Sequence, residues 1–156
     1  MKMRRLLMAG TTVAVLVAAF VAFAQADPTT HHSLTAISGE GSGNIAVSPT
    51  ANNVGLNQFD GQVTVNIHGV APNTVYTASR NADFNANGIC TNTTFAPFSP
   101  AITTSAEGAG AAHYEVLRGP PAFPLFVEGA KFDVSFRLVG TDGTVLTSEC
   151  FTVTVK

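Results

Sequence analysis

Apolar and polar residues alternate with a period of two from about residue 32 onward, and no stretch shows the stripe of a helix. The clearest case is the segment 131–139. Polar or charged residues alternate there with four apolar residues that share one face of the segment: Phe132, Val134, Phe136 and Leu138. This alternation predicts a β-strand with one face on a hydrophobic core. We therefore expect an all-β protein.

A second strand is expected directly after this one. Asp142-Gly143 is a favoured pair for a tight hairpin turn, and alternation resumes in 145–147 and 150–155. The interruption between these two segments predicts a kink near Ser148. The C-terminal part of the chain is thus predicted to form a hairpin whose second arm is bent.

Shorter alternating segments bring the expected number of strands to seven or eight. In chain order they are 33–37, 43–47, 63–68, 74–79, the two arms of a hairpin within 102–117, and 124–127. Turn-forming residues separate them, as in β-sandwiches, so the predicted fold is a two-sheet antiparallel sandwich. The stretch 70–76 resembles the tyrosine corner of immunoglobulin-like domains, in which a Tyr hydroxyl, here that of Tyr76, binds upstream backbone.

Two segments show no alternation, 81–100 and 118–124. Irregular segments of this length are usually functional or held by a crosslink. They contain four phenylalanines: Phe84, Phe95, Phe98 and Phe123. If both segments emerge at one end of the sandwich, these rings form a candidate surface for a partner. The alternative is that the rings cap the core, and the sequence leaves both open.

The segment 1–26 has the composition of an export signal. Basic residues come first, an apolar stretch follows from Leu6 to Phe23, and small residues at Ala24 and Ala26 suit a signal peptidase. We expect cleavage there and a single domain over 27–156, located outside the cytoplasm as a secreted or periplasmic protein. The alternative is an uncleaved segment that anchors the protein in a membrane.

The chain has two cysteines, Cys90 and Cys150. An oxidising compartment favours a disulfide between them. Such a bridge would close a loop of about 60 residues, which a chain-entropy estimate values at about 4 kcal/mol. Redox-active pairs usually stand two residues apart, so a structural bridge is the better interpretation.

A longer block of sequence resembles a copper/zinc superoxide dismutase, a family of β-sandwiches. The likeness rests on short pieces in the order that family has them: 61–69, 88–91, 98–100, 106–108 and Cys150. The resemblance implies the pairing of the two half-cystines. The His-x-His metal ligands of that family are missing, because neither 76–81 nor 81–100 contains a histidine. The dismutase reaction is therefore not implied.

Other candidate chemistry is weak. The four histidines are scattered: His31, His32, His68 and His113. Oxygen ligands at alternate positions in Asp83, Asn85 and Asn87 suggest a calcium loop, but no bidentate acid follows. No Gly-x-Ser-x-Gly motif or pair of carboxylates points to catalysis. We expect no catalytic residue, no metal ligand and no cofactor.

The net charge is −2, and it becomes more negative once the three basic residues of the signal are removed. Nucleic acid is therefore an unsuitable partner. The predicted function is that of a secreted, non-catalytic β-sandwich. It would bind an extracellular or periplasmic protein or small ligand through its loop end, or serve as a structural module, without stable membrane insertion after signal cleavage. The alternative is a metal-dependent enzyme similar to copper/zinc dismutase.

Overall fold

The structure is a computed structural model that describes residues 29–52, 58–118 and 129–156. The predicted export signal 1–26, the strand 124–127 and Phe123 lie outside these residues. The described residues form ten strands: β1 Thr30–Ser38, β2 Ser42–Asn52, β3 Gln58–His68, β4 Val75–Asp83, β5 Ala96–Pro97, β6 Ile102–Thr103, β7 Gly110–Arg118, β8 Lys131–Gly140, β9 Val145–Thr147 and β10 Phe151–Thr154. No helix in this described part is long and apolar enough to cross a membrane.

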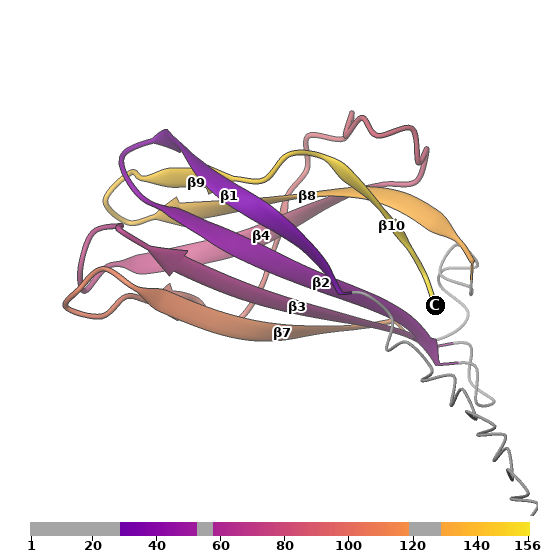
Figure 1. Ribbon diagram of the computed structural model, residues 1–156, viewed down its shortest axis with the longest axis horizontal. Coiled ribbons are helices and arrows are strands. Elements are labelled where there is room, and N and C mark those ends of the chain that lie inside the picture. Colours follow the sequence, from indigo (N-terminus) through magenta and orange to yellow (C-terminus); the bar gives the residue numbers. More distant parts are fainter. Residues whose placement is uncertain (1–28, 53–57, 119–128) are drawn as a thin grey trace, which may run out of the picture.

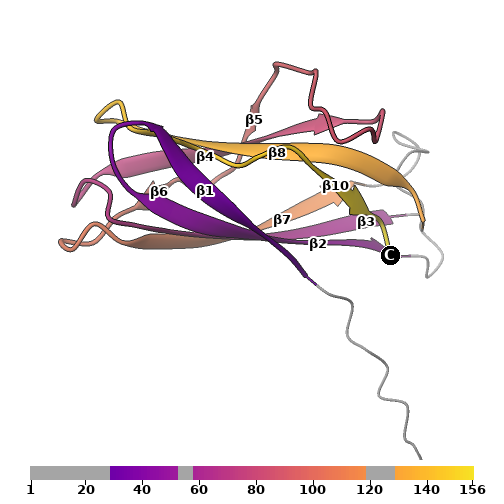
Figure 2. The same ribbon diagram turned by 45° about the horizontal axis from the view of Figure 1, so that its top comes forward.

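The strands are antiparallel and belong to one hydrogen-bonded sheet. Its order is β5-β4-β8-β9-β1-β2-β3-β7, with β10 paired to β8 and β6 paired to β4. The sheet is strongly curled, like half of a barrel, so that β4 and β8 lie opposite β2, β3 and β7 (Figures 1 and 2). The all-β antiparallel class is therefore confirmed.

The prediction of two separate sheets is not what the hydrogen bonds show, because β9 joins the two layers. Leu146 of β9 lies opposite Leu138 of β8 on one side and opposite Ala36 of β1 on the other. The register of β1 shifts between Ala36 and Ser38, which marks a bulge. A bulge bends its strand and increases its twist, so β1 passes from the layer of β9 to that of β2 without a break in the sheet.

The C-terminal hairpin agrees with the prediction. β8 extends from Lys131 to Gly140, and β9 and β10 pair with two successive parts of it. Ser148 holds the kink between them. Its N–H donates to the Phe136 carbonyl at 3.0 Å, and its hydroxyl oxygen accepts the N–H of Phe136 at 2.9 Å.

The predicted hairpin within 102–117 is wrong. β6 pairs with β4, where Ile102 lies opposite Tyr76, whereas β7 pairs with β3 along its whole length. The tyrosine corner is absent too, because the Tyr76 hydroxyl lies 3.4 Å from a carboxylate oxygen of Asp142 in the β8–β9 turn rather than at upstream backbone. Local alternation shows which face of a strand is buried, but it does not show which strand lies beside it.

The core lies inside the curl and is made by the alternating residues of opposed strands. Its largest fully buried side chains are Tyr76, Phe136, Leu34, Ile45, Ile67, Ile102, Leu138 and Leu146. β8 contributes Phe132, Val134, Phe136 and Leu138, the four residues whose alternation marked this strand in the sequence.

Candidate functional site: an apolar cavity beside the disulfide-anchored loop

The disulfide between Cys90 and Cys150 is present, with the two Cα atoms 5.6 Å apart. It connects the loop 84–95, which we call the covering loop, to the residue that precedes β10. This loop follows β4 and arches over the upper side of β8 in Figure 1 before the chain returns to β4 as β5. The predicted crosslink of the irregular segment is therefore confirmed.

The covering loop rests on polar residues of the outer faces of β4 and β8. Asn81, Asp83, Asp133 and their neighbours Ser79 and Ser135 are buried although they point away from the core. Asp133 is fully buried, and its Oδ2 accepts hydrogen bonds from the N–H groups of Asn87 and Gly88 at 2.8 and 2.7 Å. These buried polar side chains fix the backbone of the loop through hydrogen bonds.

The pKa of Asp133 reflects two opposing effects. Burial alone would raise it, but hydrogen bonds from the Thr152 hydroxyl and from the N–H groups of Gly88 and Asn87 outweigh burial and lower the pKa. Asp83 is held in a similar way: the hydroxyl of Thr91, then the N–H groups of Asn85 and Thr91, lower the pKa of Asp83. Both groups are therefore carboxylates at neutral pH.

These contacts change the interpretation of the suggested calcium loop. N–H donors of the loop point at Asp83 and Asp133, and the side-chain oxygen of Asn87 accepts the N–H of Ile89. The oxygens face their own backbone rather than a shared point. Within residues 29–52, 58–118 and 129–156, no group of three or more His, Cys, Asp or Glu side chains is placed to hold a metal ion.

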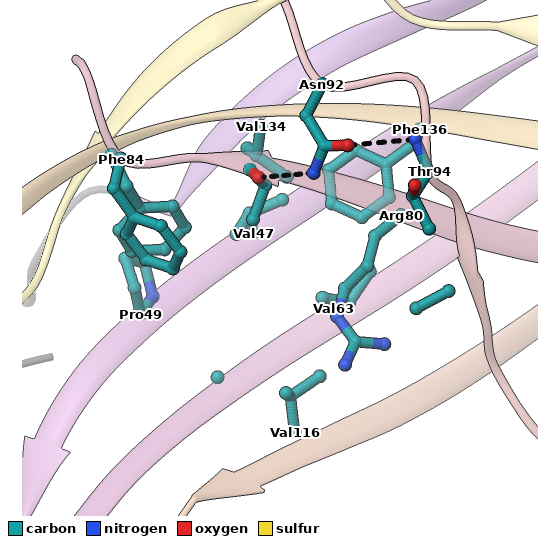
Figure 3. Close-up of a pocket in the computed structure, with 14 residues that line it drawn as sticks. Val47, Pro49, Val63, Arg80, Phe84, Asn92, Thr94, Val116, Val134 and Phe136 are labelled. Atoms are coloured by element: carbon teal, nitrogen blue, oxygen red, sulfur yellow. Dashed lines mark hydrogen bonds between the residues drawn. The ribbon is translucent and has the colours of Figure 1, made fainter. Parts of the chain in front are cut away.

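An apolar cavity of about 260 Å³ lies inside the curl, next to the covering loop. Its walls come from six strands (β2, β3, β4, β5, β7 and β8) and from the loop. The lining residues are Val47, Pro49, Gly61, Val63, Arg80, Ala82, Phe84, Asn92, Thr94, Ala96, Val116, Phe132, Val134 and Phe136. Figure 3 shows valines of opposed strands on its walls and Asn92 and Thr94 on the side of the loop. Apolar walls with a few polar groups are typical of ligand pockets.

The loop side of the cavity has a defined conformation. The Asn92 amide donates to the carbonyl of Ala82 at 3.2 Å and accepts the N–H of Thr94 at 2.9 Å (Figure 3). The Asn81 amide in turn donates to the Asn92 carbonyl. The disulfide at Cys90 stands two residues away. The wall is thus formed before any ligand arrives.

Arg80 is the one charged residue that lines this cavity among the described residues. It lies on the inner face of β4, in phase with Tyr76 and Ala78, and its guanidinium carbon is 4.8 Å from the centroid of the Phe98 ring. The sequence interpretation ended this strand at Ser79 and missed Arg80. Extending the alternation 76, 78, 80, 82 by two positions would have placed an arginine on the core face.

A second, smaller and more polar pocket of about 200 Å³ adjoins the first and shares Arg80 and Val116 with it. Tyr114 lines this second pocket; its ring stacks on Phe98 with 4.5 Å between centroids. Its hydroxyl is buried and has no hydrogen-bond partner within the described part of the chain. Burial raises the pKa of Tyr114, so the hydroxyl keeps its proton.

The structure does not bring the predicted phenylalanines together on one surface. Phe98 is buried in the core, Phe95 is half-buried with the Arg137 guanidinium 4.2 Å from its ring, and Phe84 is 41% exposed beside the cavity. Phe98 therefore caps the core, and only Phe84 remains at an accessible site. Phe123 lies outside the described residues.

The histidines are also apart. His31 and His32 belong to β1, and the His32 ring stacks on Phe151 with 3.3 Å between centroids. His68 hydrogen-bonds the Ser42 hydroxyl at 3.0 Å, and His113 hydrogen-bonds the Thr64 hydroxyl at 2.9 Å.

Comparisons with protein-family models, with curated proteins and with solved structures found no match for this chain.

Proposed function

We propose that this protein is a non-catalytic binding module that takes the apolar part of a ligand into the cavity beside the covering loop. The cavity of about 260 Å³ with its valine and phenylalanine walls is the observation that supports the proposal. The cavity is open to solvent beside the covering loop, where Phe84, Asn92 and Thr94 are exposed, so a ligand can enter it. An apolar ligand group would remove its apolar walls from water, which favours binding.

Preformed walls strengthen this proposal. Binding loses affinity when loops and side chains must become ordered, and a rigid site avoids that loss. Here the covering loop is fixed by the Cys90–Cys150 bridge and by hydrogen bonds to Asp83 and Asp133. No observation in the described residues favours the alternative, a metal-dependent enzyme similar to copper/zinc dismutase, because the histidines do not converge.

The proposal is tested with toluene, an apolar probe without a polar group, titrated into the protein and followed by methyl chemical shifts. We expect saturable shifts at Val63, Val116 and Val134, which line the cavity. Scattered shifts without saturation would overturn the proposal.

Two matched substitutions locate the site. Ala82 and Ala112 are both partly buried and packed against the core, but only Ala82 lines the cavity. Ala82→Leu should fill part of the cavity and weaken toluene binding, whereas Ala112→Leu should leave it unchanged. Equal effects of the two substitutions would place the probe elsewhere and contradict the proposal.

We infer further that the protein works outside the cytoplasm, as a secreted or periplasmic protein, because disulfides persist in oxidising compartments. The composition of residues 1–26 supports this. Cell fractionation should find the protein exported and without the segment 1–26. A cytoplasmic protein with two free thiols would contradict the inference.

A further inference from the structure

We propose that the ligand is an amphipathic anion, with an apolar group in the cavity and a carboxylate head bound by Arg80 and Tyr114. This inference rests on the proposed function and names the chemical class of its ligand. The two pockets provide the matching pair of environments, since the larger is apolar and the smaller is the more polar of the two, with Arg80, Ser99, Tyr114 and Glu115 in its lining. Both share Arg80 and Val116, so one molecule can extend from the first into the second.

Arg80 supplies the positive charge at the junction. In Figure 3 its side chain extends from β4 across the cavity toward Val63 and Val116. A guanidinium keeps its charge at all ordinary pH values and binds carboxylates through two parallel hydrogen bonds. Apolar surroundings strengthen the attraction of this charge for an anion.

Tyr114 supplies a second donor on the same side. Its hydroxyl is buried and lacks a hydrogen-bond partner among the described residues. A buried polar group without a partner is unfavourable by about 1–3 kcal/mol, so a ligand oxygen that accepts from it gains affinity. Tyr114 and Arg80 both contact the Phe98 ring and both line the smaller pocket. Both residues carry hydrogen-bond donors and line one pocket, which favours an oxygen anion over a cation.

Glu115 is the feature of the smaller pocket that opposes an anion. Its neighbours Tyr114 and Val116 point inward, whereas Glu115 is exposed, so solvent screens its charge. We expect Glu115→Gln to strengthen carboxylate binding modestly, by less than about threefold, as is typical of an exposed charge pair. A weaker carboxylate affinity in this variant would contradict the assignment of an anionic head to this pocket.

The size of the cavity limits the apolar group. An apolar cavity of about 150 Å³ admits benzene, so the space of about 260 Å³ has room for roughly eight to ten carbon atoms. Octanoate and 1-octanol are therefore suitable probes. They share the alkyl chain and differ only in the head, carboxylate against hydroxyl.

The experiment is calorimetric titration of both probes into the wild type and into two variants, Tyr114→Phe and Arg80→Gln. We expect the wild type to bind octanoate about tenfold or more tightly than 1-octanol. Each variant should lose most of this preference while keeping its affinity for 1-octanol. Tyr114→Phe removes only a hydroxyl without a partner among the described residues, so the fold is expected to persist.

Matched controls test for general effects on the fold. Tyr76→Phe removes a hydroxyl at the far β8–β9 turn, and Arg137→Gln removes a guanidinium that lies over Phe95 on the outer face of β8. Both should keep the preference for octanoate. If either control loses the preference as fully as its partner variant, the inference is overturned.

The outcomes separate this inference from the proposed function. If the wild type binds toluene and binds octanoate and 1-octanol equally, the cavity is a binding site but the anionic head is wrong. If none of the three probes binds, the proposed function fails together with the inference. A preference for octanoate that depends on both Arg80 and Tyr114 supports both.

Discussion

Replacement of Asp133 tests whether a buried carboxylate holds the covering loop in place. This side chain is fully buried and accepts hydrogen bonds from the Thr152 hydroxyl and from the N–H groups of Asn87 and Gly88. It therefore links three segments: β8, β10 and the loop. Asp133→Asn keeps the shape and removes the charge, whereas Asp133→Ala also removes the acceptors.

The expected magnitude follows from the three hydrogen bonds. A hydrogen bond to a charged group contributes about 1.5–3 kcal/mol and a neutral one about 0.5–1.5 kcal/mol, so the loss of charge weakens each bond by about 1 kcal/mol. Relief from burying a charge offsets part of this sum. We expect Asp133→Asn to lower the free energy of unfolding by about 2 kcal/mol, and Asp133→Ala by about 4 kcal/mol because three donors lose their acceptor.

The contribution of Asp133 to the free energy of unfolding depends on pH. Because the folded-state pKa of Asp133 is lowered, the carboxylate stabilises the fold at pH values above its unfolded pKa of about 4. This stabilisation is lost as the pH falls through the folded-state pKa. The difference in unfolding free energy between wild type and Asp133→Asn should therefore be constant above about pH 5 and shrink below about pH 4.

The assay is urea unfolding followed by far-UV circular dichroism, since the chain has no tryptophan. The disulfide stays oxidised in every sample. Asp142→Asn is the control. This carboxylate also accepts three hydrogen bonds, from the Thr144 hydroxyl at 2.8 Å, the Thr144 N–H at 3.1 Å and the Tyr76 hydroxyl at 3.4 Å, but it lies exposed in a surface turn where water can replace them, so it should contribute less than about 1 kcal/mol. If Asp133→Asn lies within about 0.5 kcal/mol of the wild type at pH 7, the Asp133 carboxylate does not hold the covering loop in place.

Three further results are expected. Reduction of the disulfide should lower the free energy of unfolding by about 4 kcal/mol in urea titrations, as the closed loop of 60 residues implies; an unchanged midpoint would contradict this. The affinity for straight-chain carboxylates should rise about fourfold per methylene, from about 0.8 kcal/mol each, and level off near ten carbons; a continued rise in calorimetry would place the chain outside the cavity. Burial lowers the pKa of His32, so its proton NMR titration should have a midpoint below 6.5. The contribution of the neutral ring to stability is present above the unfolded pKa and should be lost as the pH falls from that value through the folded-state pKa; a higher midpoint would argue against the stacking of the partly buried ring on Phe151.

The parts of the fold that the sequence predicts are those set by neighbouring residues. The alternation in 131–139 and the Asp142-Gly143 turn give β8, the hairpin and the kink near Ser148. The strand pairings that join distant segments were not predictable. β9 lies between β8 and β1, and β6 pairs with β4. These pairings depend on how the whole sheet curls, and the alternation of apolar and polar residues within a strand does not indicate which strand lies beside it.

β4 shows why polar residues misled the interpretation of the site. Asn81 and Asp83 indicated the start of an irregular segment, yet both belong to the strand and both are buried. A polar residue usually marks a face in water, but here the covering loop lies over that face and satisfies its hydrogen bonds. Because the predicted strand ended at Ser79, Arg80 was not assigned to its inner face. The sequence analysis therefore missed the charge at the centre of the candidate site.

The polar anchoring of the covering loop also explains how a cavity persists beside it. A loop held by apolar side chains would direct them into the nearest apolar space, which here is the interior of the curl. Instead the loop is fixed on the outer faces of β4 and β8 by Asp133, Asp83 and the disulfide. Of its residues only Phe84, Asn92 and Thr94 line the cavity, and Phe84 is partly exposed to solvent rather than inserted into the core. The hydrogen bonds to Asp83 and Asp133 and the disulfide therefore hold the loop wall in place without filling the cavity. The space stays available to a ligand.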